Sequence, residues 1–211
     1  MPAESATILP IAVGRRERNK LRMKEHIYTT ALSLFIEKGF EKTTIEEIAE
    51  RADVARGTFV NHFQHKDELI TTWSKQRQTR LEEKLQKSRR EDDDVPTALR
   101  RCIAALAEIN EEDRELNGVM LTAWVRAGLP ITEEPRTAEL FADAIRSGLE
   151  SGQTARYVCV DPMQVGHLLR DAYLGALFRW CRSGWPGDAK GSLFVELCRI
   201  LDIVLPGITE T

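Results

Sequence analysis

Residues 44–69 constrain the fold more than any other part of the sequence, because they contain two short helical patterns joined by a tight turn and opening onto a third helix. Thr43 and Thr44 stand three residues before Glu46 and Glu47. Either register forms a capping box, in which a threonine hydroxyl and a glutamate carboxylate satisfy free backbone N–H groups. The sequence therefore predicts that the first short helix begins at one of these threonines.

The turn and the second short helix follow directly. The turn is expected at residues 52–54, where Asp53 can adopt the left-handed backbone that such turns often require, though less easily than glycine. The second helix is expected from about Ala55 to Phe63. Small Ala49 would let the two helices cross closely. Apolar residues would hold their angle, namely Ile45, Ile48, Val54, Phe59 and Phe63.

The second short helix has an outer face that is too polar for packing alone. Its exposed side chains are expected to be Arg56, Thr58, Asn61 and His62, all of which can donate hydrogen bonds. Such donors suit the base edges and phosphates of DNA, and Gly57 would let a phosphate approach the backbone. The arrangement is typical of a helix-turn-helix, whose second helix enters the major groove.

The distribution of charge agrees with a DNA-binding N-terminal part. The whole chain of 211 residues has a formal net charge of −3. Residues 1–90 nevertheless carry 18 Lys and Arg against 13 Asp and Glu, whereas residues 91–211 carry 12 against 20. Such asymmetry is expected when only one domain contacts DNA. A solvated basic face without a partner would look the same, so charge alone does not decide.

The chain is predicted to be all-α, with about nine helices in two domains. Residues 1–14 lack helical periodicity and are interpreted as a flexible tail. Residues 15–66 are predicted to form the helix-turn-helix DNA-binding domain, of three helices. Residues 67–211 are predicted to form a larger helical domain for regulation and dimerisation.

Local signals place some of the C-terminal helices. Asp161-Pro162 is a good helix start, because aspartate caps free N–H groups and proline fits the first helical position. This helix is expected to continue to about Ser183. A last helix is expected from about Ala189 to Leu205, before Pro206-Gly207. The only short β-like run is residues 156–160.

Composition and motifs count against several other classes of protein. With 42% hydrophobic and 30% charged residues the chain is ordinary for a globular protein, and no apolar run approaches the length of a membrane span. The short apolar stretch at residues 8–13 precedes its charges, unlike a signal peptide, so a cytoplasmic location is expected. We find no Glu-x-x-His pair, phosphate loop or nucleophile elbow, so neither an enzyme nor a cofactor is expected. Scattered cysteines favour reduced thiols over a metal site or disulfides: Cys102, Cys159, Cys181 and Cys198.

A longer set of residues around the turn matches a known pattern. The set comprises Phe40, Thr43-Thr44, Ile45, Ile48-Ala49, Ala52, Val54, Gly57-Thr58, His62-Phe63 and Lys66-Asp67-Glu68-Leu69. By these residues, roughly positions 20–72 closely resemble the TetR family of bacterial transcriptional regulators. The remainder agrees with that family only in length and helical character.

The resemblance implies roles for individual residues. Thr44, with Thr43 beside it, and Lys66 are expected to clamp backbone phosphates at two helix starts. The further DNA-binding candidates are Arg56 and Asn61 as base readers, and Gly57, Thr58 and His62 as contacts to phosphates or bases. Three positions depart from the family pattern, so the half-site sequence is not predicted: Asp53, Ala55 and Val60.

The last two predicted helices carry more apolar surface than one core requires. This surplus favours a dimer, in which the two helices pair with their copies in a four-helix bundle, as the family resemblance also implies. A thick monomer core is the alternative. The residues expected at the dimer interface are Leu168, Leu169, Ala172, Ala176, Trp180, Leu193, Leu197 and Leu201.

Arg170 stands out because it lies inside the apolar arc of its helix. A buried guanidinium needs an anion, which would be either a ligand carboxylate or phosphate or an internal Asp or Glu. Candidate walls of a ligand pocket are aromatic or flexible apolar residues, each of which could also be plain core: Met120, Trp124, Phe141, Tyr173 and Phe178.

These observations predict a homodimeric regulator that binds specific double-stranded DNA. We expect a repressor that a small-molecule effector releases from a palindromic operator. A regulator that activates transcription remains open, as does a helical adaptor that binds only protein. An adaptor would leave the polar face of the second short helix without a purpose.

Overall fold

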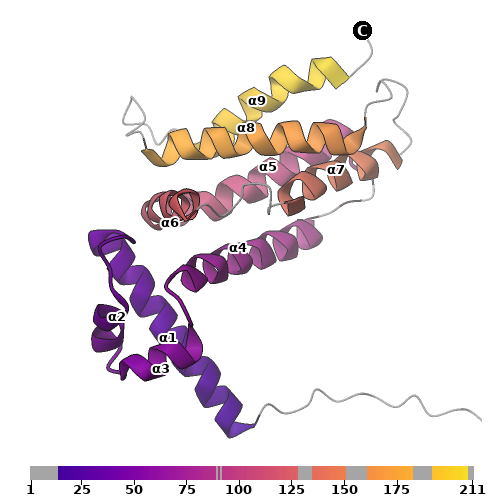
Figure 1. Cartoon of the computed structure of the whole chain (residues 1–211). Coiled ribbons are helices and arrows are strands. Elements are labelled where there is room, and N and C mark those ends of the chain that lie inside the picture. The colour runs from indigo at the N-terminus through magenta and orange to yellow at the C-terminus, as the bar shows by residue number, and fades with distance from the viewer. Residues whose placement is uncertain are drawn as a thin grey trace, which may run out of the picture.

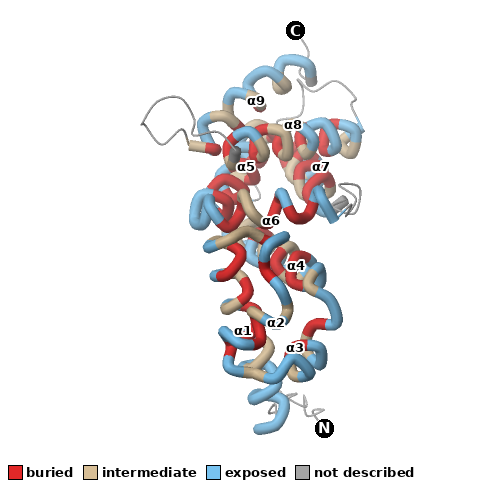
Figure 2. Tube along the Cα trace, turned by 60° about the vertical axis from the view of Figure 1, so that its left-hand side comes forward, coloured by how far each residue is buried: buried red, intermediate tan, exposed pale blue. Residues whose placement is uncertain are grey.

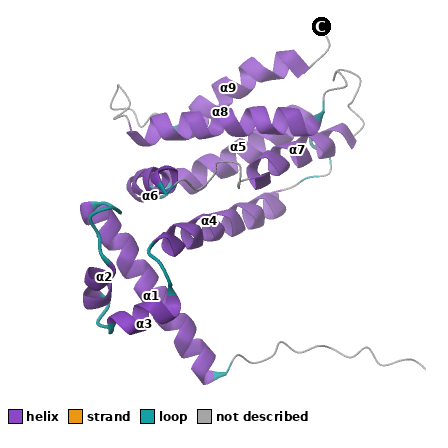
Figure 3. Cartoon of the chain, in the orientation of Figure 1, coloured by secondary structure: helices purple, strands orange, loops and turns teal. Residues whose placement is uncertain are grey.

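Helices and connecting loops make up all of the chain that the computed structural model describes, which is residues 14–88, 90, 92–127, 135–150, 161–182 and 192–208 (Figure 3). The nine helices of these residues confirm the predicted all-α class. None of them combines the length and apolar character that a bilayer crossing requires. The tail at residues 1–13, the β-like run at 156–160 and Cys159 lie outside the described residues.

Three helices form the N-terminal unit, α1 (Arg15–Lys38), α2 (Ile45–Arg51) and α3 (Arg56–His62). The long helix α1 is buried along one stripe whose spacing follows one helix face: Ile27, Ala31, Leu34 and Phe35. The two short helices α2 and α3 cross each other, and α2 packs against α1. In Figure 1 this unit stands apart from the larger bundle and includes the predicted helix-turn-helix.

The larger bundle consists of six helices stacked in layers (Figure 1). They are α4 (Asp67–Ser88), α5 (Val95–Glu111), α6 (Arg114–Arg126), α7 (Pro135–Glu150), α8 (Pro162–Arg182) and α9 (Leu193–Ile208). The central helix α5 contacts α4, α6, α7 and α9. The bundle also meets the N-terminal unit, because α1 contacts α6.

The helix α8 begins and packs as its sequence dictates. Its start is confirmed, since the Asp161 carboxylate accepts a hydrogen bond from the Met163 N–H at 2.9 Å. It crosses α7 so closely that a Cβ atom on Gly166 would lie 2.4 Å from the Ala138 carbonyl oxygen. Glycine is therefore required at this crossing.

The last helix differs from its predicted bounds at its C-terminal end. It begins at Leu193, because the Ser192 carbonyl accepts from the N–H groups of Val195 and Glu196 and so closes the first turn there. Residues 189–191, where the predicted start falls, lie outside the described residues. At the other end α9 continues through Pro206 to Ile208, although a proline removes one backbone donor and disfavours the helix around it.

The structure corrects most of the predicted dimer surface, because those side chains lie inside the single chain. Six of them are buried in its own core, namely Leu169, Ala176, Trp180, Leu193, Leu197 and Leu201. Ala172 is half-buried, and only Leu168 is well exposed, at 54%. The reason is that α8 packs against α6, α7 and α9 at once, which uses its wide apolar arc within one chain. Much of α9 nevertheless remains exposed (Figure 2).

Candidate nucleic-acid interface and inner cavity

A rigid frame holds the turn between α2 and α3. Asp53 has φ +52°, which confirms the left-handed backbone expected of it. The turn closes through a 2.9 Å hydrogen bond from the Val54 N–H to the Ala49 carbonyl. The imidazole Nε2 of His26 on α1 lies 3.2 Å from the Ala52 carbonyl oxygen. The turn is thus fixed both by its own backbone and by α1.

The start of α2 is a complete capping box at Thr44. The Thr44 hydroxyl oxygen accepts from the Glu47 N–H at 3.2 Å, and the Glu47 carboxylate accepts from the Thr44 N–H at 2.9 Å. Lys38 lies 2.5 Å from the same carboxylate and holds the pKa of Glu47 at about 2. Because the exposed Thr44 hydroxyl serves as an acceptor here, its hydrogen remains able to donate to a phosphate.

Thr43 is buried, whereas it was predicted to contact DNA. Its side chain is buried, with 1% exposed, and its hydroxyl donates to the Gly39 carbonyl at 2.8 Å. The structure therefore corrects its assignment to the DNA-binding set, because Thr43 joins the end of α1 to the start of α2. Sequence spacing allowed either threonine to cap α2, and packing selects Thr44.

Lys66, just before α4, is tied back to the connection between α1 and α2. Its ammonium donates to the carbonyls of Phe40 at 2.8 Å and Thr43 at 3.0 Å. The same nitrogen lies 4.3 Å from the centroid of the Phe40 ring. An ammonium has three donors, so one remains for a phosphate.

The outer face of α3 carries Arg56, Gly57, Val60 and Asn61, all of which are exposed. Thr58, predicted to be on this face, is half-buried. Val60 is not among the predicted contact residues, although its spacing of four residues from Arg56 puts it on the same helix face. An exposed valine there can contact a thymine methyl group.

Arg56 is engaged within the N-terminal unit. Its Nε lies 2.7 Å from the Glu46 carboxylate on α2, and this hydrogen bond lowers the pKa of Glu46. Both side chains are well exposed, so the ion pair stabilises the fold little. Arg56 can therefore exchange this carboxylate for a base edge at small cost.

His62 is turned partly inward. Its Nδ1 is buried and has no hydrogen-bond partner among the described residues. Burial lowers the pKa of His62, and the nearby charges of Lys20 and Lys24 lower it further. Only the other ring nitrogen, Nε2, could contact DNA. The predicted DNA contact of His62 is therefore limited to this one atom.

The basic start of α1 lies close to the same surface. Figures 1 and 2 both show the N-terminal end of α1 extending beyond α3. Its exposed cations are Arg15, Arg16, Arg18, Lys20 and Arg22. Such a cluster of exposed cations suits a phosphate backbone.

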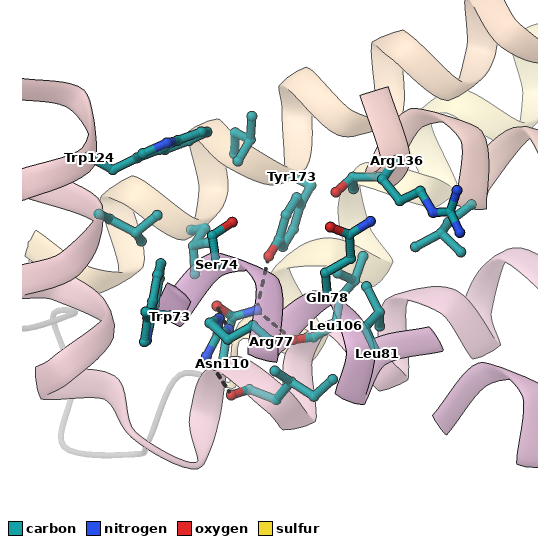
Figure 4. Close-up of a pocket in the computed structure, with 16 residues that line it drawn as sticks. Trp73, Ser74, Arg77, Gln78, Leu81, Leu106, Asn110, Trp124, Arg136 and Tyr173 are labelled. Atoms are coloured by element: carbon teal, nitrogen blue, oxygen red, sulfur yellow. Dashed lines mark hydrogen bonds between the residues drawn. The ribbon is translucent and has the colours of Figure 1, made fainter. Parts of the chain in front are cut away.

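An inner cavity of about 70 Å³ lies in the larger bundle, between α4, α5, α6, α7 and α8 (Figure 4). Trp124 and Tyr173 line it, as predicted. Three other predicted wall residues are not among its lining, because Met120 and Phe141 are buried in the core and Phe178 packs half-buried against it. Helical spacing gives a residue's direction around its own helix but not the neighbour that it faces.

Arg170 does not line this cavity either. Its guanidinium donates twice to one carboxylate oxygen of Asp171, from Nε at 2.9 Å and from Nη2 at 2.8 Å. Of the two anions considered for Arg170, the structure therefore provides the internal carboxylate. The assignment of Arg170 to the ligand-binding set is corrected.

Polar residues that are not among the predicted site residues form a network beside the cavity. Arg77 donates to the side-chain oxygens of Asn110 at 2.6 Å and Asn117 at 2.8 Å, and it lies 4.9 Å from the Trp73 ring centroid. Asn110 in turn donates to the Tyr173 hydroxyl at 3.0 Å. The network joins α4 to α5, α6 and α8. Only their position against each other in the fold reveals these residues, which lie far apart in the sequence.

The segment around the turn is similar to known proteins. The family model for bacterial regulatory proteins of the tetR family matches residues 27–71. The transcriptional regulator TcmR of Streptomyces glaucescens is 40% identical over 63 residues, which cover 30% of this chain and 28% of TcmR. YuxN, an uncharacterized regulator of Bacillus subtilis, is 28% identical over 119 residues, which cover 56% and 38% of the two chains. This chain therefore spans well under half the length of these two relatives.

Solved structures extend the likeness to nearly the whole chain. Thermus thermophilus FadR, a TetR-family repressor solved with lauroyl-CoA, is 26% identical, covers 87% of this chain and 94% of its own, and has a TM-score of 0.58. A TetR-family regulator from Pectobacterium atrosepticum is 20% identical, covers 94% and 99%, and has a TM-score of 0.68. The second likeness concerns the fold alone.

Proposed function

We propose that this chain, whose residues 27–71 match the model of the tetR family of bacterial regulatory proteins, is a transcriptional regulator of that family that binds specific palindromic DNA as a homodimer. The observation that carries the proposal is the outer face of α3, which is exposed, offers the donors Arg56 and Asn61, and is joined to α2 by a hydrogen-bonded turn. We expect the protein to repress, and to act in the cytoplasm, where its DNA partner lies.

The outer face of α3 has the chemistry to read bases. Arginine pairs with the acceptors of guanine, asparagine pairs with adenine, and an apolar side chain contacts the thymine methyl. Arg56, Asn61 and Val60 offer these three kinds of contact on one helix face. Each bidentate pair discriminates by about 1–3 kcal/mol. Thr44 and Lys66 would then fix the register through phosphates.

A dimer would present two such helices to two half-sites. Exposed apolar side chains on α8 and α9 support this assembly, namely Leu168, Phe194, Val195 and Ile203. They replace the buried residues first expected there. Sedimentation analysis should give twice the chain mass of 24.0 kDa, and a Leu168→Glu chain should dissociate. A monomeric wild-type chain at micromolar concentration would contradict the dimer.

An effector would act through the inner cavity. The cavity is lined partly by α4, the helix that follows the DNA-binding unit directly. A ligand that favours one position of α4 would change the separation of the two DNA-binding heads, and so the DNA affinity. The lauroyl-CoA complex of the Thermus relative supports a small-molecule effector.

Selection of genomic fragments by the purified protein tests this function. We expect enrichment of a palindrome whose binding weakens steeply as salt rises, because phosphate contacts release counterions. Recovery of no specific duplex would contradict DNA regulation and favour the protein-binding adaptor. Fusing the selected site to a reporter gene separates repression from activation.

A further inference from the structure

The charged side chains that line the inner cavity are of one sign, although Arg136 is paired with Glu82 just outside this lining. Among the described residues that line it, the charged side chains are Arg77 and Arg136, with no Asp or Glu. Figure 4 shows Arg136 at one end of the cavity and Trp73 and Trp124 toward the other. Two guanidinium groups attract an anion and repel a cation. The aromatic and aliphatic wall between them suits an apolar body.

A second cavity, of about 250 Å³, adjoins the first between α4, α5 and α7. Arg136 and Leu140 line both cavities, so they stand at the boundary. The apolar part of the second lining consists of Leu85, Ala98, Cys102, Leu140 and Ala144. The inner cavity alone is far below the roughly 300–1,000 Å³ of ordinary ligand sites, and only both together reach that range. A ligand would therefore have to pass Arg136.

At this boundary the guanidinium of Arg136 is already paired with a carboxylate of the same chain. The Nε of Arg136 lies 2.7 Å from Oε1 of Glu82, and the Gln78 amide donates to the same oxygen at 3.3 Å. Glu82 lines only the second cavity. The pair is partly solvated, with 53% of the arginine and 31% of the glutamate side chain exposed. Its loss therefore costs little, and an incoming anion can replace Glu82.

We propose that the effector is an organic anion with an apolar body. Its anionic group replaces the Glu82 carboxylate on Arg136, and its apolar part extends from the second cavity toward Trp73 and Trp124. Because Glu82 belongs to α4 and Arg136 to α7, binding releases a tie between these helices. Binding of this anion does not depend on the proposed function. Only its role as the effector rests on that function.

The test uses dodecanoate as the probe and the full-length protein without DNA. Tryptophan fluorescence reports binding, because Trp73 and Trp124 line the inner cavity, and calorimetry gives the affinity. We expect saturable binding of dodecanoate, and binding at least about tenfold weaker for dodecanol and for dodecyltrimethylammonium, which lack the negative charge. A hydrogen-bonded ionic contact is worth about this factor.

Two substitutions with opposite effects make the test specific. Arg136→Gln removes the cation and should weaken dodecanoate binding about tenfold, with little effect on dodecanol. Glu82→Gln removes the nearer of the two carboxylates beside Arg136, the other being Glu139 at 3.8 Å, and should strengthen dodecanoate binding severalfold. Arg100→Gln is the matched control and should change neither, because it breaks a similar exposed pair, with Asp202 at 2.6 Å, away from both cavities.

Several results would overturn the proposal. They are the absence of dodecanoate binding to the wild type, equal affinity for dodecanol, and an unchanged affinity in Arg136→Gln. DNA binding is measured separately on the same preparations, so a protein that binds its selected palindrome but not dodecanoate keeps its function and loses only this ligand assignment.

Discussion

At the scale of one residue, Gly57 separates what packing requires from what DNA binding requires. A Cβ atom added there meets no other atom within 4 Å, so packing does not require glycine. Glycine inside a helix instead costs about 0.5–1 kcal/mol relative to alanine. A surface residue that costs stability without a packing reason points to a partner that approaches the backbone.

We therefore predict that Gly57→Ala stabilises the protein and weakens DNA binding. The free energy of unfolding should rise by about 0.5–1 kcal/mol, whereas affinity for the selected palindrome should fall about tenfold through a lost contact with phosphate. Urea denaturation and fluorescence anisotropy measure the two. Gly118→Ala on α6, whose added Cβ makes only ordinary contact with Cys181, should leave DNA affinity unchanged. Equal affinity of Gly57→Ala and wild type would contradict the close approach.

His62 makes the free energy of unfolding depend on pH. Because burial lowers its pKa in the folded chain, the unfolded chain takes up a proton more readily as pH falls through about 6.5. We predict that the free energy of unfolding decreases from pH 7.5 to 5.5, and decreases less in His62→Gln. Glu47 does not interfere, since its lowered pKa affects stability only below about pH 4.5. Identical pH profiles for the two proteins would exclude His62 as the cause.

At the scale of the element, caps made helix starts predictable, whereas the breaker Pro206-Gly207 did not end α9. Asp161-Pro162 and the capping box of α2 use side chains within three residues of the backbone groups that they satisfy, so the sequence contains the whole interaction. It was harder to predict which neighbour each helix face contacts. The wide apolar arc of α8 has the same spacing whether it packs against helices of its own chain or of a second copy, and Leu169 and Trp180 therefore appeared to be interface residues.

The crossing of α7 and α8 gives a prediction at this scale. Gly166→Ala places a methyl group against the Ala138 carbonyl oxygen, a backbone atom that cannot turn aside. The substitution should lower the free energy of unfolding by about 1–3 kcal/mol. Gly175→Ala on the same helix is the control, because its Cβ would meet only the end of the Arg179 side chain at 3.5 Å. Equal losses in urea denaturation would contradict a specific crossing.

At the scale of the whole molecule, the helix α4 connects the two parts of the proposed function. Lys66, just before its first turn, is bonded to the α1–α2 connection, while Arg77 and Glu82 further along contact the cavities. The sequence predicted the DNA-binding unit because its contacts fall within about one contiguous segment. The cavity could not be predicted, since the residues that line it come from five helices and are spread from Trp73 to Leu177.

Equilibrium binding of the selected palindrome and of a scrambled duplex tests the central claim most directly. We predict that wild type prefers the palindrome, and that Arg56→Ala and Asn61→Ala lose about 1–3 kcal/mol of this preference per base contact. Binding to the scrambled duplex should change far less. Arg100→Ala, in the larger bundle, should keep the full preference. Equal affinity of the wild type for both duplexes, or full preference in Arg56→Ala and Asn61→Ala, would contradict reading of DNA by the outer face of α3.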